Sequence, residues 1–182
     1  MAIADAPESQ AEAAVDPGEF RAAEPEPQHL WLKQLIGEWT YTMEMKGGMP
    51  QPADGSEPPH FAGTESVHAF GDLWVVGEMM SGDGAHFSRV TLGYDPQKGH
   101  YVGTWFSSMM TYLWVYKGEL DEAQRVLTLS SEGPSFTDPT VLASYQDVIT
   151  IHDDDYRTMT ARHQDENGEW QEMMVMHYRR VK

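Results

Sequence analysis

Residues 71–109 have the sequence GDLWVVGEMMSGDGAHFSRVTLGYDPQKGHYVGTWFSSM. Three runs rich in Val, Trp, Phe, Tyr and Thr, at 73–80, 86–94 and 101–109, alternate here with turn clusters of Gly, Asp, Ser and Pro. Such residues favour extended structure, and short spacing between turns indicates antiparallel strands. The same rhythm continues on both sides, so the chain after Gly37 predicts an all-β sandwich or barrel.

The turn clusters divide this region into ten expected strands. Just before them, Leu32, Leu35 and Ile36 fall at helical spacing and Gly37 follows, which predicts one or two helical turns at a barrel mouth. The Pro- and Gly-rich stretch Gly47–Pro59 predicts a loop. The expected strands are Glu38–Lys46, Phe61–Phe70, Leu73–Met80, His86–Tyr94, Tyr101–Met109, Tyr112–Leu120, Arg125–Ser131, Tyr145–Ile151, Tyr156–His163 and Trp170–Arg180.

Composition narrows the function classes. The 182 residues carry 12 Lys and Arg against 29 Asp and Glu, a net charge of −17, which opposes binding to nucleic acid or to an anionic membrane surface. There is no Cys, and no secretory signal or bilayer-spanning stretch is present, so a cytoplasmic protein is expected. Residues 1–27 predict a disordered acidic Ala/Pro/Glu tail, and 28–182 predict a single β-barrel domain.

Alternate side chains of a strand share a face, so the sequence also predicts a lumen. Aromatic and Met side chains gather on one phase of several strands, and two acids, Glu78 and Asp147, share a phase with apolar residues. For Met173–Met176 this alternation does not decide which side chains point inward, because both phases are apolar. The expected lumen residues are Tyr41, Met43, Trp74, Glu78, Trp105, Tyr112, Trp114, Tyr116, Asp147 and Met159.

The two ends of the predicted barrel resemble a known pattern. Gly37-Glu38-Trp39 heads the first strand, and Tyr178-Arg179-Arg180 ends the last. This resembles the calycins, the lipocalin and fatty-acid-binding-protein group, in which an Arg of the last strand covers the Trp of a Gly-x-Trp motif. A guanidinium over an indole gains a cation–π contact, so Trp39 is expected against Arg179 or Arg180.

A wider resemblance covers nearly everything after His29. The segments 31–39, 91–96, 101–105, 113–120 and 178–180 are similar to domain-of-unknown-function family 1579, a bacterial family. That resemblance implies a calycin-like antiparallel barrel of about ten strands with a short N-terminal helix, and no catalytic residue can be transferred from it. A more distant resemblance to nitrobindin-like haem barrels makes His177 a candidate axial ligand.

Three kinds of function follow from a container of this type. The leading hypothesis is a non-enzymatic binder of a small apolar molecule held in the lumen. The second is a small hydrolase or isomerase that uses Glu78 or Asp147 as acid or base. The third is a filled barrel with a structural or partner-binding role. No resident cofactor and no metal site are expected, because Cys is absent and the His residues lack tight spacing.

Overall fold

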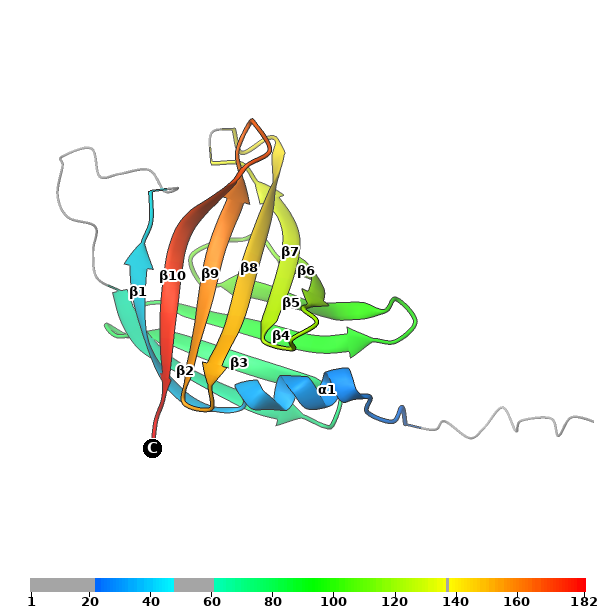
Figure 1. The fold of residues 1–182 in the computed structure, drawn as a ribbon. Coiled ribbons are helices and arrows are strands. Elements are labelled where there is room, and N and C mark those ends of the chain that lie inside the picture. The colour runs from blue at the N-terminus through cyan, green and yellow to red at the C-terminus, as the bar shows by residue number, and fades with distance from the viewer. Residues whose placement is uncertain (1–21, 48–60, 137) are drawn as a thin grey trace, which may run out of the picture.

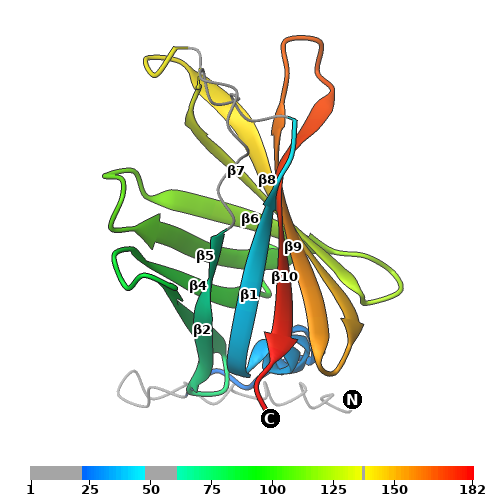
Figure 2. The same cartoon turned by 90° about the vertical axis from the view of Figure 1, so that its left-hand side faces the viewer.

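The fold is a closed barrel of ten antiparallel strands. The computed structural model describes residues 22–47, 61–136 and 138–182, and its strand order is β1-β10-β9-β8-β7-β6-β5-β4-β3-β2, with β2 paired to β1 (Figures 1 and 2). The strands are β1 Gly37–Met45, β2 Phe61–Phe70, β3 Trp74–Ser81, β4 Phe87–Asp95, β5 His100–Ser107, β6 Trp114–Leu120, β7 Val126–Pro134, β8 Leu142–Asp153, β9 Tyr156–Gln164 and β10 Trp170–Arg180.

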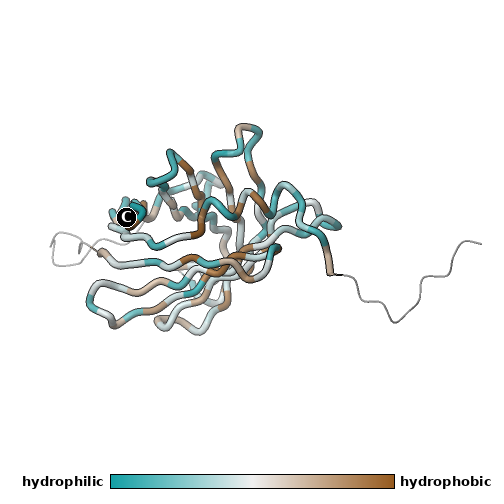
Figure 3. Tube along the Cα trace, turned by 90° about the horizontal axis from the view of Figure 1, so that it is seen from below, coloured by the Kyte–Doolittle hydropathy of each residue, from teal (hydrophilic) through white to brown (hydrophobic). Residues whose placement is uncertain are grey.

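All ten expected strands are present, and their ends move by a few residues at most sites. The turn clusters end strands because they supply backbone that a pleated strand does not use. Gly71 and Gly99, for example, have φ values of +66° and +68°, in the left-handed region that favours glycine. Buried and exposed residues alternate in β1 and β6, and Figure 3 shows hydrophobic and hydrophilic stretches interspersed along the chain.

The helical turns predicted just before Gly37 are confirmed, and they cover one end of the barrel. Helix α1 spans Pro27–Leu32, and a 3₁₀ turn at Lys33–Leu35 leads into β1. The Trp31 Nε1–H donates to the Gln124 carbonyl at 2.8 Å, and the Trp31 ring meets the Tyr101 ring edge-on. The helix therefore closes the lower end of the barrel in the orientation of Figure 1.

The structure of β10 shows which side chains of Met173–Met176 are buried, a question that the sequence did not decide. Its register with β9 shifts between Glu172 and Met174, which marks a bulge. A bulge places an extra residue on one strand, so the alternation of faces is interrupted there. Met173 and Met176 are consequently both buried, although they are three residues apart.

Two of the expectations fall largely on residues that the structure does not describe. The acidic tail expected at 1–27 lies mainly in 1–21, and the loop expected at Gly47–Pro59 lies mainly in 48–60. Within the described part of the chain, no helix is both long enough and apolar enough to cross a bilayer.

Candidate functional site

The lumen differs between its two ends. Near the helix-covered end, the inward side chains are almost completely buried, as Leu92, Tyr101 and Leu127 show. Toward the opposite end a second buried cluster forms from Tyr145, Ala161 and Met173, and some of the inward aromatic and Met side chains packed against the two clusters keep part of their surface accessible. This partly exposed set, which we call the open half of the lumen, includes Met43, Met79, Trp105, Trp114 and Met159.

An acid and a phenol meet in this lumen. Asp147 on β8 lies between Leu129 of β7 and Ala161 of β9, and its Oδ2 accepts a hydrogen bond from the Tyr116 hydroxyl at 2.5 Å. Burial raises the pKa of Asp147 to about 6, and the Tyr116 hydrogen bond acts against that rise. Burial and the neighbouring carboxylate raise the pKa of Tyr116 well above its ordinary value. The carboxyl group can therefore gain or lose a proton near neutral pH.

A second polar pair lies on the same inner face. The Arg157 guanidinium of β9 pairs with the Glu65 carboxylate of β2, and both side chains are about 5 % exposed or less. The guanidinium also lies 4.0 Å from the centre of the Tyr178 ring and 4.7 Å from that of Trp39. Burial raises the pKa of Glu65, and the positive charge of Arg157 opposes that rise. The charge of Arg157 is thus already compensated inside the barrel.

The strand registers place most of the predicted lumen residues on the inner face. Tyr112 lies just before β6, where its hydroxyl donates to the Glu132 carbonyl at 3.0 Å and its ring packs edge-on against Trp114. The predicted residues whose strand phase points inward are Tyr41, Met43, Trp105, Trp114, Tyr116, Asp147 and Met159.

The phase predicted for the strand at 73–80 is wrong. Val75 and Gly77 are buried there, and Trp74 and Glu78 alternate with them on the outer face. Trp74 is 39 % exposed and its ring covers the backbone of Gly93, while Glu78 pairs with Arg89 at the surface. The inner face has little room here, because a Cβ at Gly77 would lie 2.8 Å from Cγ1 of Val90. Packing space, rather than apolar size alone, therefore decides which phase is buried.

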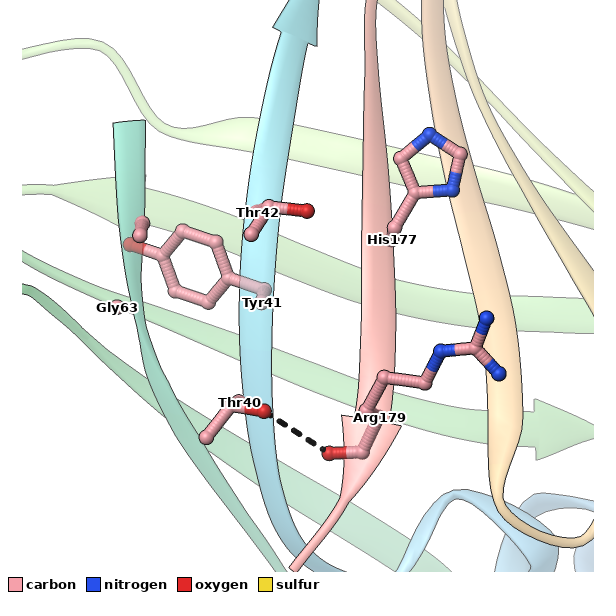
Figure 4. Close-up of a pocket in the computed structure, with 7 residues that line it drawn as sticks. Thr40, Tyr41, Thr42, Gly63, His177 and Arg179 are labelled. Atoms are coloured by element: carbon pink, nitrogen blue, oxygen red, sulfur yellow. Dashed lines mark hydrogen bonds between the residues drawn. The ribbon is translucent and has the colours of Figure 1, made fainter. Parts of the chain in front are cut away.

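His177 and Arg179 also lie on the outer face. His177 Nδ1 is 2.9 Å from the Tyr156 hydroxyl, and the Arg179 guanidinium lies 3.6 Å from the centre of the Tyr156 ring. These two side chains border an external groove with Thr40 and Thr42 (Figure 4). His177 therefore does not fit an axial haem ligand inside the lumen, because its strand phase points away from it.

Barrel closure follows the expected geometry through Arg180. Its guanidinium lies 4.1 Å from the centre of the Trp39 ring, and β1 pairs with β10 from Trp39 to Met45. The same guanidinium donates to the carbonyls of Ile36 at 2.6 Å and Gln34 at 3.1 Å. A single side chain thus joins the last strand, the first strand and the helical segment.

The sequence predictions missed Glu65 and Arg157. Glu65 shares a strand phase with Val67 and Gly63. An acidic residue on this inward phase was the sequence feature that could have predicted a buried charge. Arg157 is two residues from Met159, on the same phase. In the sequence, each of the two residues resembles an ordinary surface charge. Their pairing can be recognised only in the closed barrel, where β2 and β9 face the same lumen.

Comparison with known proteins defines the family. The chain belongs to the family described as "Protein of unknown function (DUF1579)", whose sequence model matches residues 24–180. No curated protein is significantly similar to it.

Solved structures are similar in fold. Rv2717c from M. tuberculosis is 13 % identical, with 87 % of this chain and 100 % of that chain covered, and has a TM-score of 0.53. A de novo designed fluorescence-activating β-barrel is 13 % identical over 80 % of this chain and 93 % of its own, with a TM-score of 0.39. At 13 % identity the similarity to Rv2717c concerns the fold alone.

Proposed function

We propose that the protein binds a small apolar molecule in the open half of the lumen. The observation that carries this proposal is that inward Trp and Met side chains packed against the two buried clusters remain partly exposed, whereas a completely filled core would bury them. Trp105, Trp114 and Met159 offer adaptable apolar surface, and Asp147 with Tyr116 supplies placed polar groups. Pockets of this composition are typical of small-molecule sites.

The test is a fluorescence titration with N-phenyl-1-naphthylamine, a neutral apolar probe. Ser131 of β7 faces the lumen opposite Tyr145, so Ser131→Phe adds bulk there without removing an existing contact. Thr128→Phe places the same side chain on the outer face of the same strand. Binding by the wild type and by Thr128→Phe, with loss in Ser131→Phe, supports a lumen site. Equal binding by all three, or none by the wild type, contradicts it.

A second candidate function uses the same carboxyl group as an acid or base. A carboxyl group whose pKa is about 6, held beside a phenol inside an apolar lumen, has the properties of a general acid–base catalyst at neutral pH. Hydrolysis of p-nitrophenyl esters of increasing acyl length tests this candidate. A rate that rises through about pH 6 and disappears in Asp147→Asn would favour an enzyme over a binder.

A further inference from the structure

Asp147 is the uncompensated charge of the lumen. Arg157 is paired with Glu65, and no ion pair to Asp147 exists among residues 22–47, 61–136 and 138–182. Tyr116 occupies Oδ2 only, and within the same residues no hydrogen bond reaches Oδ1. With Glu65 and Arg157 cancelling, the ionised Asp147 gives the lumen a negative charge that no inner side chain of the described residues pairs with. His163, which lies opposite Tyr145 on the inner phase of β9, forms no ion pair with it.

Aromatic rings accompany this charge. Tyr116 touches the carboxylate directly. Burial raises the pKa of Tyr178, and the carboxylates of Glu65 and, to a smaller degree, Asp147 add to that rise, so the Tyr178 phenol lies within electrostatic reach of Asp147. Trp105 and Trp114 are directly opposed on β5 and β6 and keep part of their surface accessible in the open half. Ring faces attract cations, and a carboxylate inside a low-dielectric space attracts them more strongly than one in water.

We propose, resting on the proposed function above, that the ligand of the lumen is an amphiphilic amine. Its protonated nitrogen donates a hydrogen bond to Oδ1 of Asp147, and its apolar part lies along Trp105, Trp114 and Met159. The alternative head groups fit less well. A carboxylate would be repelled by Asp147, and a hydroxyl would donate a hydrogen bond to the carboxylate without bringing a positive charge to compensate it.

Three compounds of equal chain length separate these cases: decylamine, decanol and decanoate. Each is titrated against the wild type, Asp147→Asn and Glu78→Gln, with Trp fluorescence as the readout, at about 0.15 M and about 0.5 M salt, because exposed charges are screened within roughly 10 Å. Glu78→Gln is the matched control, since it removes the same charge from the outer face. The higher salt reduces the general attraction of an acidic surface for cations.

The expected result is that decylamine binds the wild type at least about tenfold more tightly than decanol, because only the amine brings a positive charge that compensates Asp147. Asp147→Asn should remove that preference and leave decanol binding unchanged, while Glu78→Gln should retain it. Similar affinities for all three compounds in the wild type would overturn the amine inference and leave the lumen site intact. Failure of every compound and of the neutral probe would overturn the proposed function itself.

Discussion

Arg157 and Glu65 form a buried ion pair that spans two intervening strands. Arg157 belongs to β9 and Glu65 to β2, and β10 and β1 lie between them in the sheet. The pair therefore crosses the inner side of the β1–β10 closure, where the Arg157 guanidinium lies over the Trp39 and Tyr178 rings. It links the two halves of the barrel where the first and last strands meet.

Breaking this pair should be strongly destabilising. Arg157→Met leaves the Glu65 carboxylate buried without its cation, and loss of one partner of a buried pair costs about 3–5 kcal/mol. The double variant Glu65→Gln/Arg157→Met should recover part of this loss, because no uncompensated charge remains. Urea denaturation at neutral pH gives both free energies of unfolding.

The surface pair Arg89–Glu78 provides the comparison. Its two side chains are about half exposed, so Arg89→Met should cost less than about 1 kcal/mol. A similar cost for Arg157→Met and Arg89→Met would show that the Glu65–Arg157 pair is not desolvated in solution.

The glycine of the Gly-x-Trp motif has a specific steric reason. Gly37 has φ +143°, and a Cβ built at this position would lie 2.2 Å from Nη1 of Arg180. Gly37→Ala should therefore strain the backbone and push the guanidinium away from Trp39, costing about 2–3 kcal/mol in chemical denaturation. Gly71→Ala is the control for backbone strain alone, because φ is +66° there and the space around it is open. Equal losses in the free energy of unfolding at the two sites would mean that the Arg180 side chain moves aside without a measurable loss of stability.

The strands were predictable because turns and β-formers alternate so regularly. Which face of each strand points inward was harder. Around Trp39 the inward face is clear, because the residues of the other phase are polar. In β3 both phases carry apolar residues, and the largest of them, Trp74, lies on the outer face. Side-chain size predicts burial only where the competing phase is clearly polar. The bulge at Glu172/Met174 has no local sequence signal, because it reflects pairing with β9.

For the candidate site, the inward strand phase of Asp147 follows from clear alternation in the sequence. Tyr145, Ile149 and Ile151 fix the inward phase of β8, so Asp147 had to follow them. Its partner Tyr116 lies two strands away in the sheet, and the Glu65–Arg157 pair joins positions 92 residues apart. Pairings of this kind depend on barrel closure, which no window of sequence contains.

Two tryptophans on opposite faces should respond differently to truncation. Trp39 is 2 % exposed, donates from Nε1 to the Leu35 carbonyl at 2.9 Å and lies beneath two guanidinium groups, so Trp39→Ala should cost about 3–5 kcal/mol. Trp74→Ala removes a ring from the outer face and should cost about 1 kcal/mol. Thermal and urea unfolding measure both. A loss below about 1 kcal/mol for Trp39→Ala would place this ring outside a packed core.

The last prediction concerns pH and Asp147. Its pKa is about 6 in the folded protein and about 3.9 in an unfolded chain. Between these values the folded state binds more protons, so this group's contribution to stability falls as pH rises and is lost above about pH 6. The difference between the two pKa values corresponds to a change of up to about 3 kcal/mol in the free energy of unfolding. Asp147→Asn cannot ionise, so it should gain stability relative to the wild type across that window.

Urea denaturation at about pH 4, 5, 6 and 7.5 measures this difference, because contributions from the other carboxyl groups cancel between the two proteins. Tyr116→Phe sharpens the experiment. The Tyr116 hydroxyl favours the ionised carboxylate, so its removal should raise the pKa of Asp147 and move the loss of stability to higher pH. A stability difference between Asp147→Asn and the wild type that stays constant over the whole range would mean that Asp147 titrates as it does in water. The carboxyl group would then lie in a wet space, and the amine preference proposed for the lumen would have to depend on the aromatic rings alone.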